Sequence, residues 1–116
     1  MNRQQANEAI ARRIWPTAEI EMLTRCDFVN VVIFDKPNET RSWRGFDVFE
    51  DIYAAHQLVR WFRVNSWPAL YDALRSILID KTGQPVGIVD FMLADPAEIA
   101  KAACVALEIE LEEEGK

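Results

Sequence analysis

The chain has 116 residues, of which half are hydrophobic and 28% charged, with a formal net charge of −6 and a pI near 4.8. This balance is typical of a soluble globular protein with one core, and it excludes intrinsic disorder. An acidic protein of this kind is not expected to bind nucleic acid directly or to bind an anionic membrane, whereas a basic protein partner is compatible with the charge.

The two cysteines and the N-terminus indicate the compartment. Polar and charged residues precede Ile10, which is not the pattern of a signal peptide, and no apolar run approaches the length of a membrane span. We therefore expect a cytoplasmic protein, in which Cys26 and Cys104 are small buried hydrophobes rather than a disulfide or nucleophiles.

The N-terminal part of the chain predicts a helix followed by a strand. Asn2 and Gln5 have capping-box spacing, an apolar stripe runs to Ile14, and Trp15-Pro16 ends the helix because the residue before a proline is pushed out of the helical region. Residues 18–23 then alternate apolar and acidic side chains, which indicates a strand with one wet face.

The segment Phe28–Phe34 predicts a second strand that is apolar on both faces. Such a strand must be covered on both sides, which favours helices above and below the sheet. Residues 35–45 are expected to form a loop, because Pro37 lies in a turn-like sequence and cannot extend a ladder. In that loop Trp43 lies between Arg41 and Arg44, which predicts either a contact surface or a ring folded back onto the core.

The segment Phe46–Asp80 predicts two helices in tandem, joined by a short hinge at residues 64–66. Apolar residues recur at alternating three- and four-residue steps in both halves. Ser66 occupies the position of an N-cap, and Pro68 lies in the first turn of the second helix.

The C-terminal part predicts a strand over Val86–Leu93 and a helix from Asp95 to about Glu113. Asp95, Pro96 and Glu98 give a clear helix start, and the first half of this helix is small and apolar enough to lie close against a sheet. Acidic residues at its end oppose the helix dipole, which suggests either fraying or a positively charged partner. These residues are Glu108, Glu110, Glu112, Glu113 and Glu114.

Together the elements predict an α+β fold, a three-layer α/β/α sandwich with a small, mainly antiparallel sheet and about four helices. We expect a single α/β domain over residues 1–116 with an acidic C-terminal helix end.

The sequence offers no set of residues that demands a reaction. His56 lies five residues after Asp51, so on a helix the two side chains point in different directions. His56 is also the only histidine, and with two distant cysteines it cannot complete a zinc site. No serine lies in a strained-turn motif, and Gly83 and Gly87 do not form a phosphate-binding loop. We therefore predict no catalytic residue, no metal ligand and no cofactor. The alternative is a small hydrolase that uses a divalent metal and carboxylates, for example Asp35, Asp80 and Asp90.

The remaining candidate functional residues are aromatic side chains that lie near carboxylates in the sequence. Such a combination is suited to binding a basic protein partner. The competing interpretation is that the rings belong mostly to the core. The predicted partner-binding residues are Asp47, Glu50, Asp51, Trp61, Trp67, Tyr71, Asp72, Trp43, Glu110, Glu112, Glu113 and Glu114.

Two family resemblances accompany this footprint. The order of Asn2–Trp15, the helix start at Ser66–Leu70 and the closing Asp95–Leu107 resembles small phage-encoded proteins of αβα-sandwich type. Val31–Asp35 followed by a helix and Trp67–Leu74 is similar to barstar-type ribonuclease inhibitors, in which acidic residues after a tryptophan plug a basic active site. Pro68 replaces the first of those acidic residues, so the resemblance carries over only Asp72.

Both resemblances imply a small acidic inhibitor without catalytic activity. The leading hypothesis is a phage-encoded counter-defence factor in the cytoplasm of a bacterial host, of the anti-CRISPR or anti-nuclease kind, acting on a basic nuclease or nucleic-acid-binding complex. The alternatives are an immunity protein for a nuclease toxin, the small hydrolase described above, and a structural phage component. A homodimer is compatible with each of them.

Overall fold

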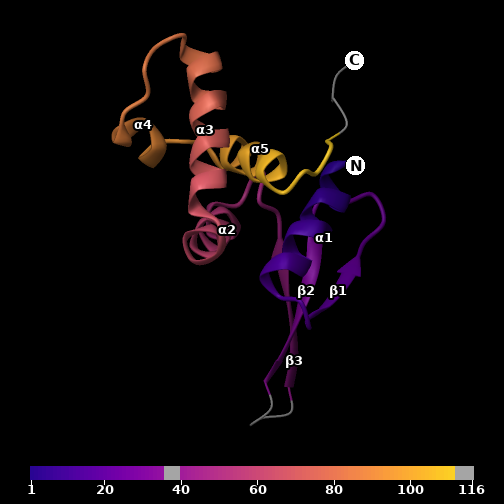
Figure 1. The fold of residues 1–116 in the computed structure, drawn as a ribbon. Helices are drawn as coiled ribbons and strands as arrows, with labels where there is room; N and C mark the ends of the chain where they lie inside the picture. Colours follow the sequence, from indigo (N-terminus) through magenta and orange to yellow (C-terminus); the bar gives the residue numbers. More distant parts are fainter. Residues whose placement is uncertain (36–39, 112–116) are drawn as a thin grey trace. The chain divides into compact units, whose positions relative to one another are not determined.

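The computed structural model describes residues 1–35 and 40–111, which form five helices and a three-stranded antiparallel sheet (Figure 1). The α+β class with a small antiparallel sheet is thereby confirmed. The elements are α1 (Arg3–Ile14), β1 (Glu19–Met22), β2 (Val29–Asp35), β3 (Thr40–Phe46), α2 (Ile52–Asn65), α3 (Trp67–Thr82), α4 (Ile88–Met92) and α5 (Pro96–Ala106).

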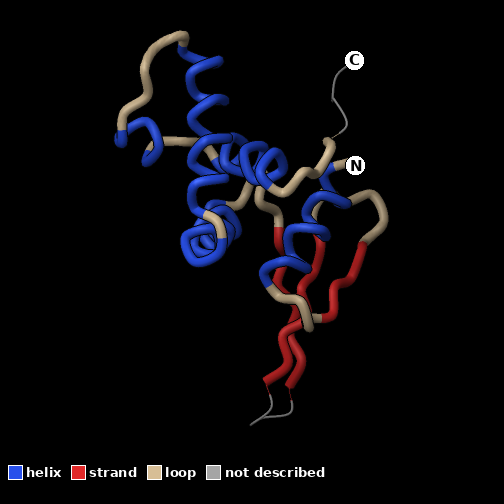
Figure 2. The backbone as a smooth tube through the Cα atoms, viewed as in Figure 1, coloured by secondary structure: helices blue, strands red, loops and turns tan. Residues whose placement is uncertain are grey.

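The chain divides into two compact units. The first contains Met1–Asp47 and holds α1 and the whole sheet, and the second contains Val48–Glu110 and holds α2 to α5. Figure 2 shows the strands confined to the first unit and only helices and loops in the second. That residues 1–116 behave as one domain stays a prediction, and each unit is described by itself below.

The first helix forms as the sequence predicts. The side chain of Asn2 accepts a hydrogen bond from the Gln5 amide at 2.9 Å, and the Asn2 amide donates to Gln5 Oε1 at 3.0 Å. This capping box satisfies two amides that have no partner inside the helix. The helix ends at Ile14, before Pro16, and it packs against β1 and β2 through its buried residues Ala6, Asn7, Ile10 and Ala11.

The sheet has the order β1-β2-β3, and its third strand is one that the sequence analysis missed. The prediction of a loop over residues 35–45 was wrong, because Thr40–Phe46 pairs with Val29–Asp35 along its whole length. Pro37 lies between the two strands in the sequence, outside the described residues, so it interrupts neither ladder.

The central strand buries a valine side chain on each of its faces. Val29 and Val31 are buried on the face that carries Phe46, and the ring of Trp15 meets Phe46 edge-on at 5.4 Å. Val32 is buried on the opposite face, across from Trp43. The expectation of a strand covered on both sides is thus confirmed at Val29, Val31 and Val32, while Asn30 is half-buried. A second helical layer over the sheet stays a prediction.

The tandem helices of the second unit are confirmed with corrected boundaries, since α2 extends to Asn65 through most of the predicted hinge and α3 extends to Thr82. The first begins at Ile52 rather than at Phe46, because Asp51 caps it by accepting a hydrogen bond from the Tyr53 amide at 2.9 Å. The second begins at Trp67 with Pro68 in its first turn, as predicted. Ser66 occupies the N-cap position, but its side chain makes no capping hydrogen bond.

The core of the second unit is a meeting of three helices. Helix α5 packs against α2 and α3, and the small side chains along it allow a close approach. The buried residues are Ala54, Ala55, Leu58 and Phe62 on α2, Leu70, Leu74 and Leu78 on α3, and Ile99, Ala100, Ala102, Ala103 and Cys104 on α5.

The last helix is shorter than predicted. It ends at Ala106 rather than near Glu113, because Glu108 adopts the left-handed conformation with φ of 58°. The Glu108 amide donates to the Val105 carbonyl at 3.2 Å and the Ile109 amide donates to the Cys104 carbonyl at 2.8 Å, the pair of bonds that closes a helix. The predicted acidic helix end is therefore wrong for Glu108 and Glu110, which lie beyond α5, while residues 112–114 lie outside the described part of the chain.

The predicted strand over Val86–Leu93 is also wrong. Residues 88–92 form the short helix α4, which starts at Gly87. The Gly87 amide donates to Asp90 Oδ2 at 2.8 Å, so the carboxylate three residues ahead stabilises the first turn. A short apolar run does not by itself distinguish a strand from a helix, and here the Gly87–Asp90 spacing decides.

Two glycines are expected to respond oppositely to substitution by alanine. Gly83 ends α3 with φ of 69°, so Gly83→Ala should lower the free energy of unfolding by about 1 kcal/mol. Gly45 lies in β3 outside the left-handed region, and an added Cβ would lie 3.6 Å from Phe28 Cδ2, an ordinary contact. Gly45→Ala should therefore be neutral or stabilising by up to about 1 kcal/mol. Urea unfolding of both variants checks the difference.

Candidate functional site

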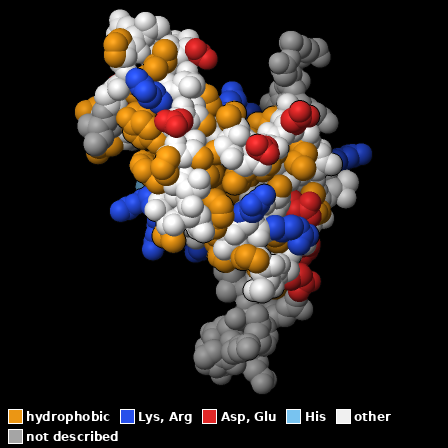
Figure 3. Space-filling view, viewed as in Figure 1, with side chains coloured by type: hydrophobic (Ala, Val, Ile, Leu, Met, Phe, Trp, Pro, Cys, Tyr) orange, Lys and Arg blue, Asp and Glu red, His pale blue; other side chains and the backbone are white. Residues whose placement is uncertain are grey.

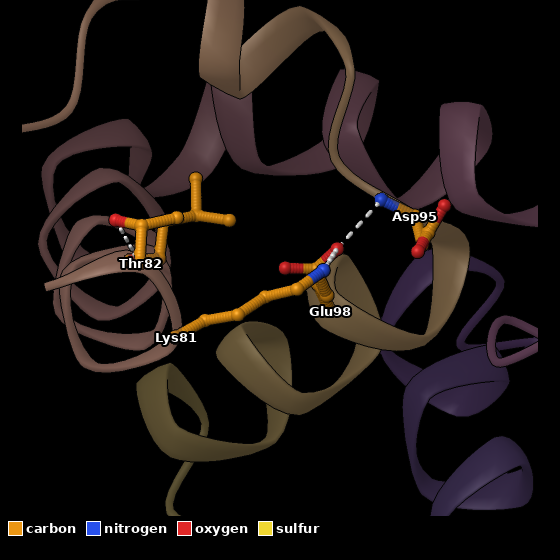
Figure 4. A network of polar contacts seen from close by, with 5 residues as sticks. Lys81, Thr82, Asp95 and Glu98 are labelled. Carbon is orange, nitrogen blue, oxygen red and sulfur yellow. Dashed lines mark hydrogen bonds and ion pairs between the residues drawn. The ribbon is translucent and has the colours of Figure 1, made fainter. Parts of the chain in front are cut away.

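The segment that carries α4 is fixed at its base by a polar network between the end of α3 and the start of α5 (Figure 4). Lys81 Nζ lies 3.2 Å from Glu98 Oε1, and the same oxygen accepts a hydrogen bond from the Asp95 amide at 3.2 Å. The Lys81 side chain is 58% exposed whereas that of Glu98 is 14% exposed, so the pair is partly shielded from water. This network holds both ends of residues 82–97 together.

Two aromatic rings meet between α3 and α4, and a third lies beside them on α3. Tyr71 stacks face to face on Phe91, with centroids 4.8 Å apart and an interplanar angle of 9°. Trp67 lies one turn before Tyr71, with its ring centroid 6.4 Å away. Trp67 and Tyr71 nevertheless stay 40% and 39% exposed. The stack therefore fixes α4 on α3 and leaves aromatic surface accessible.

The outward side of α4 is apolar as well. Val89, Met92 and Leu93 follow the i, i+3, i+4 spacing of one helix face and are 60%, 78% and 76% exposed. Figure 3 shows hydrophobic side chains gathered over the region of α4 and the adjoining part of α3. We refer to Trp67, Tyr71, Val89, Phe91, Met92 and Leu93 together as the α4 surface. A helix that is apolar on both sides is normally buried, so apolar side chains that stay exposed here make the α4 surface a candidate for interaction.

The charge of the protein is unevenly distributed along the chain. Residues 1–47 contain seven basic and seven acidic side chains, whereas residues 48–110 contain five basic and nine acidic ones. Around the α4 surface, Asp72, Asp90 and Asp95 are exposed acids and Arg75 is an exposed base. The second unit, which carries the α4 surface, is thus the acidic one.

The structure unites only part of the predicted binding footprint. Trp67 and Tyr71 lie together, with Asp72 beside them on α3. Trp61 is half-buried and packs edge-on against Phe62 at 5.0 Å. Asp51 is occupied as the cap of α2.

The other predicted residues lie elsewhere. Asp47 and Trp43 belong to the first unit, where Asp47 Oδ1 accepts a hydrogen bond from Asn7 and Trp43 is 56% exposed on β3. Glu50 lies in the turn before α2, and Glu110 follows α5. Glu112, Glu113 and Glu114 fall outside the described residues. The residues of the predicted footprint are therefore divided between the two units.

The residues that the sequence analysis missed are Val89, Phe91, Met92 and Leu93. They were assigned to the predicted strand over Val86–Leu93, and neither the helix nor their exposure was predicted. The detectable signal was the Gly87–Asp90 capping spacing, which favours a helix over a strand.

The side chains that could bind a metal or take part in acid–base chemistry do not cluster among the described residues. His56 is exposed on α2, and within the ranges 1–35 and 40–111 no three His, Cys, Asp or Glu side chains gather as metal ligands would. None of the helices in these ranges is long and apolar enough to cross a membrane.

Burial raises the pKa of Cys104 to about 11 from an ordinary value of 9.0. The folded state therefore holds the thiol proton more tightly than the unfolded state, and this contribution to stability is complete below pH 9 and lost as the pH rises towards 11. We expect a loss of about 2 kcal/mol over this range that is absent in Cys104→Ala. Urea unfolding of both proteins at pH 8 to 11 measures it, and equal pH dependence would contradict it.

Comparisons with protein-family models, curated proteins and solved structures gave no match for this chain. The features of the chain that bear on function are the α4 surface and the negative charge of the unit that carries it.

Proposed function

We propose that this chain is a non-catalytic binding protein that occupies the surface of a basic protein partner through the α4 surface. The observation that carries the proposal is the combination of three exposed apolar side chains, Val89 and Met92 on α4 and Leu93 at its C-cap, with partly exposed rings on α3. Large aromatic and flexible side chains are the usual anchors of protein interfaces.

The acidic character of the second unit supplies the second half of the argument. An excess of nine acidic over five basic side chains in residues 48–110 attracts a positively charged surface and repels an acidic one. In this interpretation the apolar α4 surface supplies most of the affinity, and the carboxylates supply the rate of association and the choice of partner. The resemblances noted in the sequence make an inhibitor the specific form of the proposal, namely a phage counter-defence factor that masks a basic nuclease complex.

A comparative pull-down tests the proposal. Tagged wild-type protein and the variants Leu93→Asp and Val105→Asp are incubated with bacterial lysate, and the retained proteins are identified by mass spectrometry. Val105 is a matched control because it is also apolar and 63% exposed in the second unit, but on α5.

We expect a basic protein that the wild type and Val105→Asp retain, that Leu93→Asp loses, and that is released as salt screens the charges. For the inhibitor form, the purified partner should lose nuclease activity when wild-type protein is added and not when Leu93→Asp is added. Retention of the same proteins by the wild type and both variants would contradict a role for the α4 surface. Capture of an acidic protein would contradict the selection of a basic partner by the acidic second unit.

A further inference from the structure

The geometry of the α4 surface points to a partner of a particular shape. We infer that its occupant is a basic amphipathic α-helix, whose apolar face lies on Val89, Met92 and Leu93 and whose lysine or arginine side chains meet Asp72 and Asp90. This inference rests on the proposed function and specifies the kind of segment that the partner contributes.

The first argument is the spacing of the exposed residues. Val89, Met92 and Leu93 form one i, i+3, i+4 face of α4, and all three are more than half exposed. Side chains at this spacing form ridges along a helix that fit the grooves of another helix. The complementary occupant is a helix with its own apolar stripe.

The second argument is the secondary structure around the site. The described residues of the second unit are helical or loop, and the strands with unpaired edges, β1 and β3, belong to the first unit. A peptide that adds a strand to a sheet edge therefore has no edge to join within the second unit. Tyr71, with one face stacked on Phe91 at an interplanar angle of 9°, has only its other face left for a proline-rich ligand.

The third argument is charge, which selects a basic occupant and disfavours a second copy. Asp90 lies on α4 itself and Asp72 lies next to Tyr71 on α3, and both are exposed. Two copies that met through the α4 surface would bring these carboxylates towards each other, which opposes self-association. A helix with lysines beside its apolar stripe would pair with them instead.

A peptide experiment tests the inference directly. The probe is a synthetic amphipathic helix of about 20 residues, long enough for helix formation, with leucines at i, i+3, i+4 and i+7 and lysines beside them. Two control peptides are used: one has the same composition in scrambled order, and the other has glutamates in place of the lysines. Binding is measured by isothermal titration calorimetry at low salt.

The methionine methyl groups report where the peptide binds. The chain has three methionines, of which Met92 lies on the α4 surface and Met22, 40% exposed on β1, serves as an internal control. We expect the Met92 methyl resonance, assigned by Met92→Leu, to move on addition of the basic helix while that of Met22 stays in place. We also expect about tenfold weaker binding by Leu93→Asp and unchanged binding by Val105→Asp.

Each other outcome overturns the inference. Equal binding of the scrambled peptide would show that helical periodicity plays no part, and equal binding of the acidic peptide would remove the charge selection. A Met92 resonance that moves with protein concentration alone would assign the surface to a second copy of this chain. If the basic helix fails to bind while a basic protein is captured through Leu93, the helical occupant is wrong and the proposed function stands. If neither binds, both are wrong.

Discussion

Phe62→Ala is expected to lower the free energy of unfolding by about 3–5 kcal/mol. Phe62 is completely buried on α2, in the unit whose core is formed by α2, α3 and α5, and Trp61 meets its ring edge-on at 5.0 Å. Removal of the ring loses the transfer free energy of the aromatic group and leaves a cavity between helices that are already in contact.

Urea unfolding followed by far-ultraviolet circular dichroism measures the effect of Phe62→Ala. Phe62→Leu keeps most of the volume and should cost only about 1 kcal/mol. Ile52→Ala is the matched surface control, because Ile52 is 46% exposed on the same helix and its substitution should stay within about 0.5 kcal/mol. A loss below about 1 kcal/mol for Phe62→Ala would contradict the tight packing of the three helices.

The second large effect is expected at Asn7, which is a buried polar residue of the first unit. Its Nδ2 donates to the Asp27 carbonyl at 2.8 Å and to Asp47 Oδ1 at 3.1 Å, and the residue has no exposed surface. Asn7 thereby links α1 to the turn before β2 and to the end of β3. Asn7→Ala should cost about 2 kcal/mol, since it removes both hydrogen bonds and leaves unfilled space at a fully buried position.

Asn7→Asp should cost more than Asn7→Ala, about 3 kcal/mol at neutral pH, although it is nearly isosteric. The new carboxylate would face a carbonyl oxygen and the carboxylate of Asp47, so its pKa in the folded state would lie above that in the unfolded state. The variant should consequently regain stability on acidification, because a protonated carboxyl can donate. Urea unfolding at pH 7 and pH 5 checks both statements. A variant as stable as Asn7→Ala at pH 7 would argue against them.

Phe62 and Asn7 lie in different units, so the two variants also test whether residues 1–116 form a single domain. If the chain unfolds as one cooperative domain, both substitutions shift the same transition and probes of helix and of tryptophan environment coincide. If the units unfold separately, Phe62→Ala shifts only the transition of the helical unit.

Most of the helices could be predicted from the sequence, because the patterns that specify them involve residues close together in the chain. The capping box of Asn2 and Gln5, the proline at position 68 and the apolar periodicity of residues 52–78 depend on neighbouring residues, and all three were recognised correctly. The third strand could not be recognised in the same way. Thr40–Phe46 is a strand because it pairs with β2, and this pairing is not visible in the local sequence. The segment contains no valine, isoleucine or leucine, and Trp43 lies between two arginines.

The candidate site was harder to predict for a related reason. The stack of Tyr71 on Phe91 joins residues twenty positions apart, and nothing in the local sequence indicates that they meet. The mainly apolar run at residues 88–93 was predicted as a strand, because a short apolar run does not distinguish a strand from a helix. Its exposure follows from the short helix α4 directing only one side towards α3.

The attachment of α4 also has a kinetic and energetic consequence for any ligand. Helix α4 has only five residues, and the ring stack of Tyr71 on Phe91 is its main contact with α3. The Lys81–Glu98 pair joins the ends of the segment and does not hold α4 itself. Few contacts therefore oppose a transient detachment of α4 from α3. Backbone amides of residues 88–92 should accordingly exchange with deuterium much faster than those of α3. When a ligand immobilises this turn, the loss of conformational entropy makes the binding free energy less favourable, and the observed affinity is correspondingly lower.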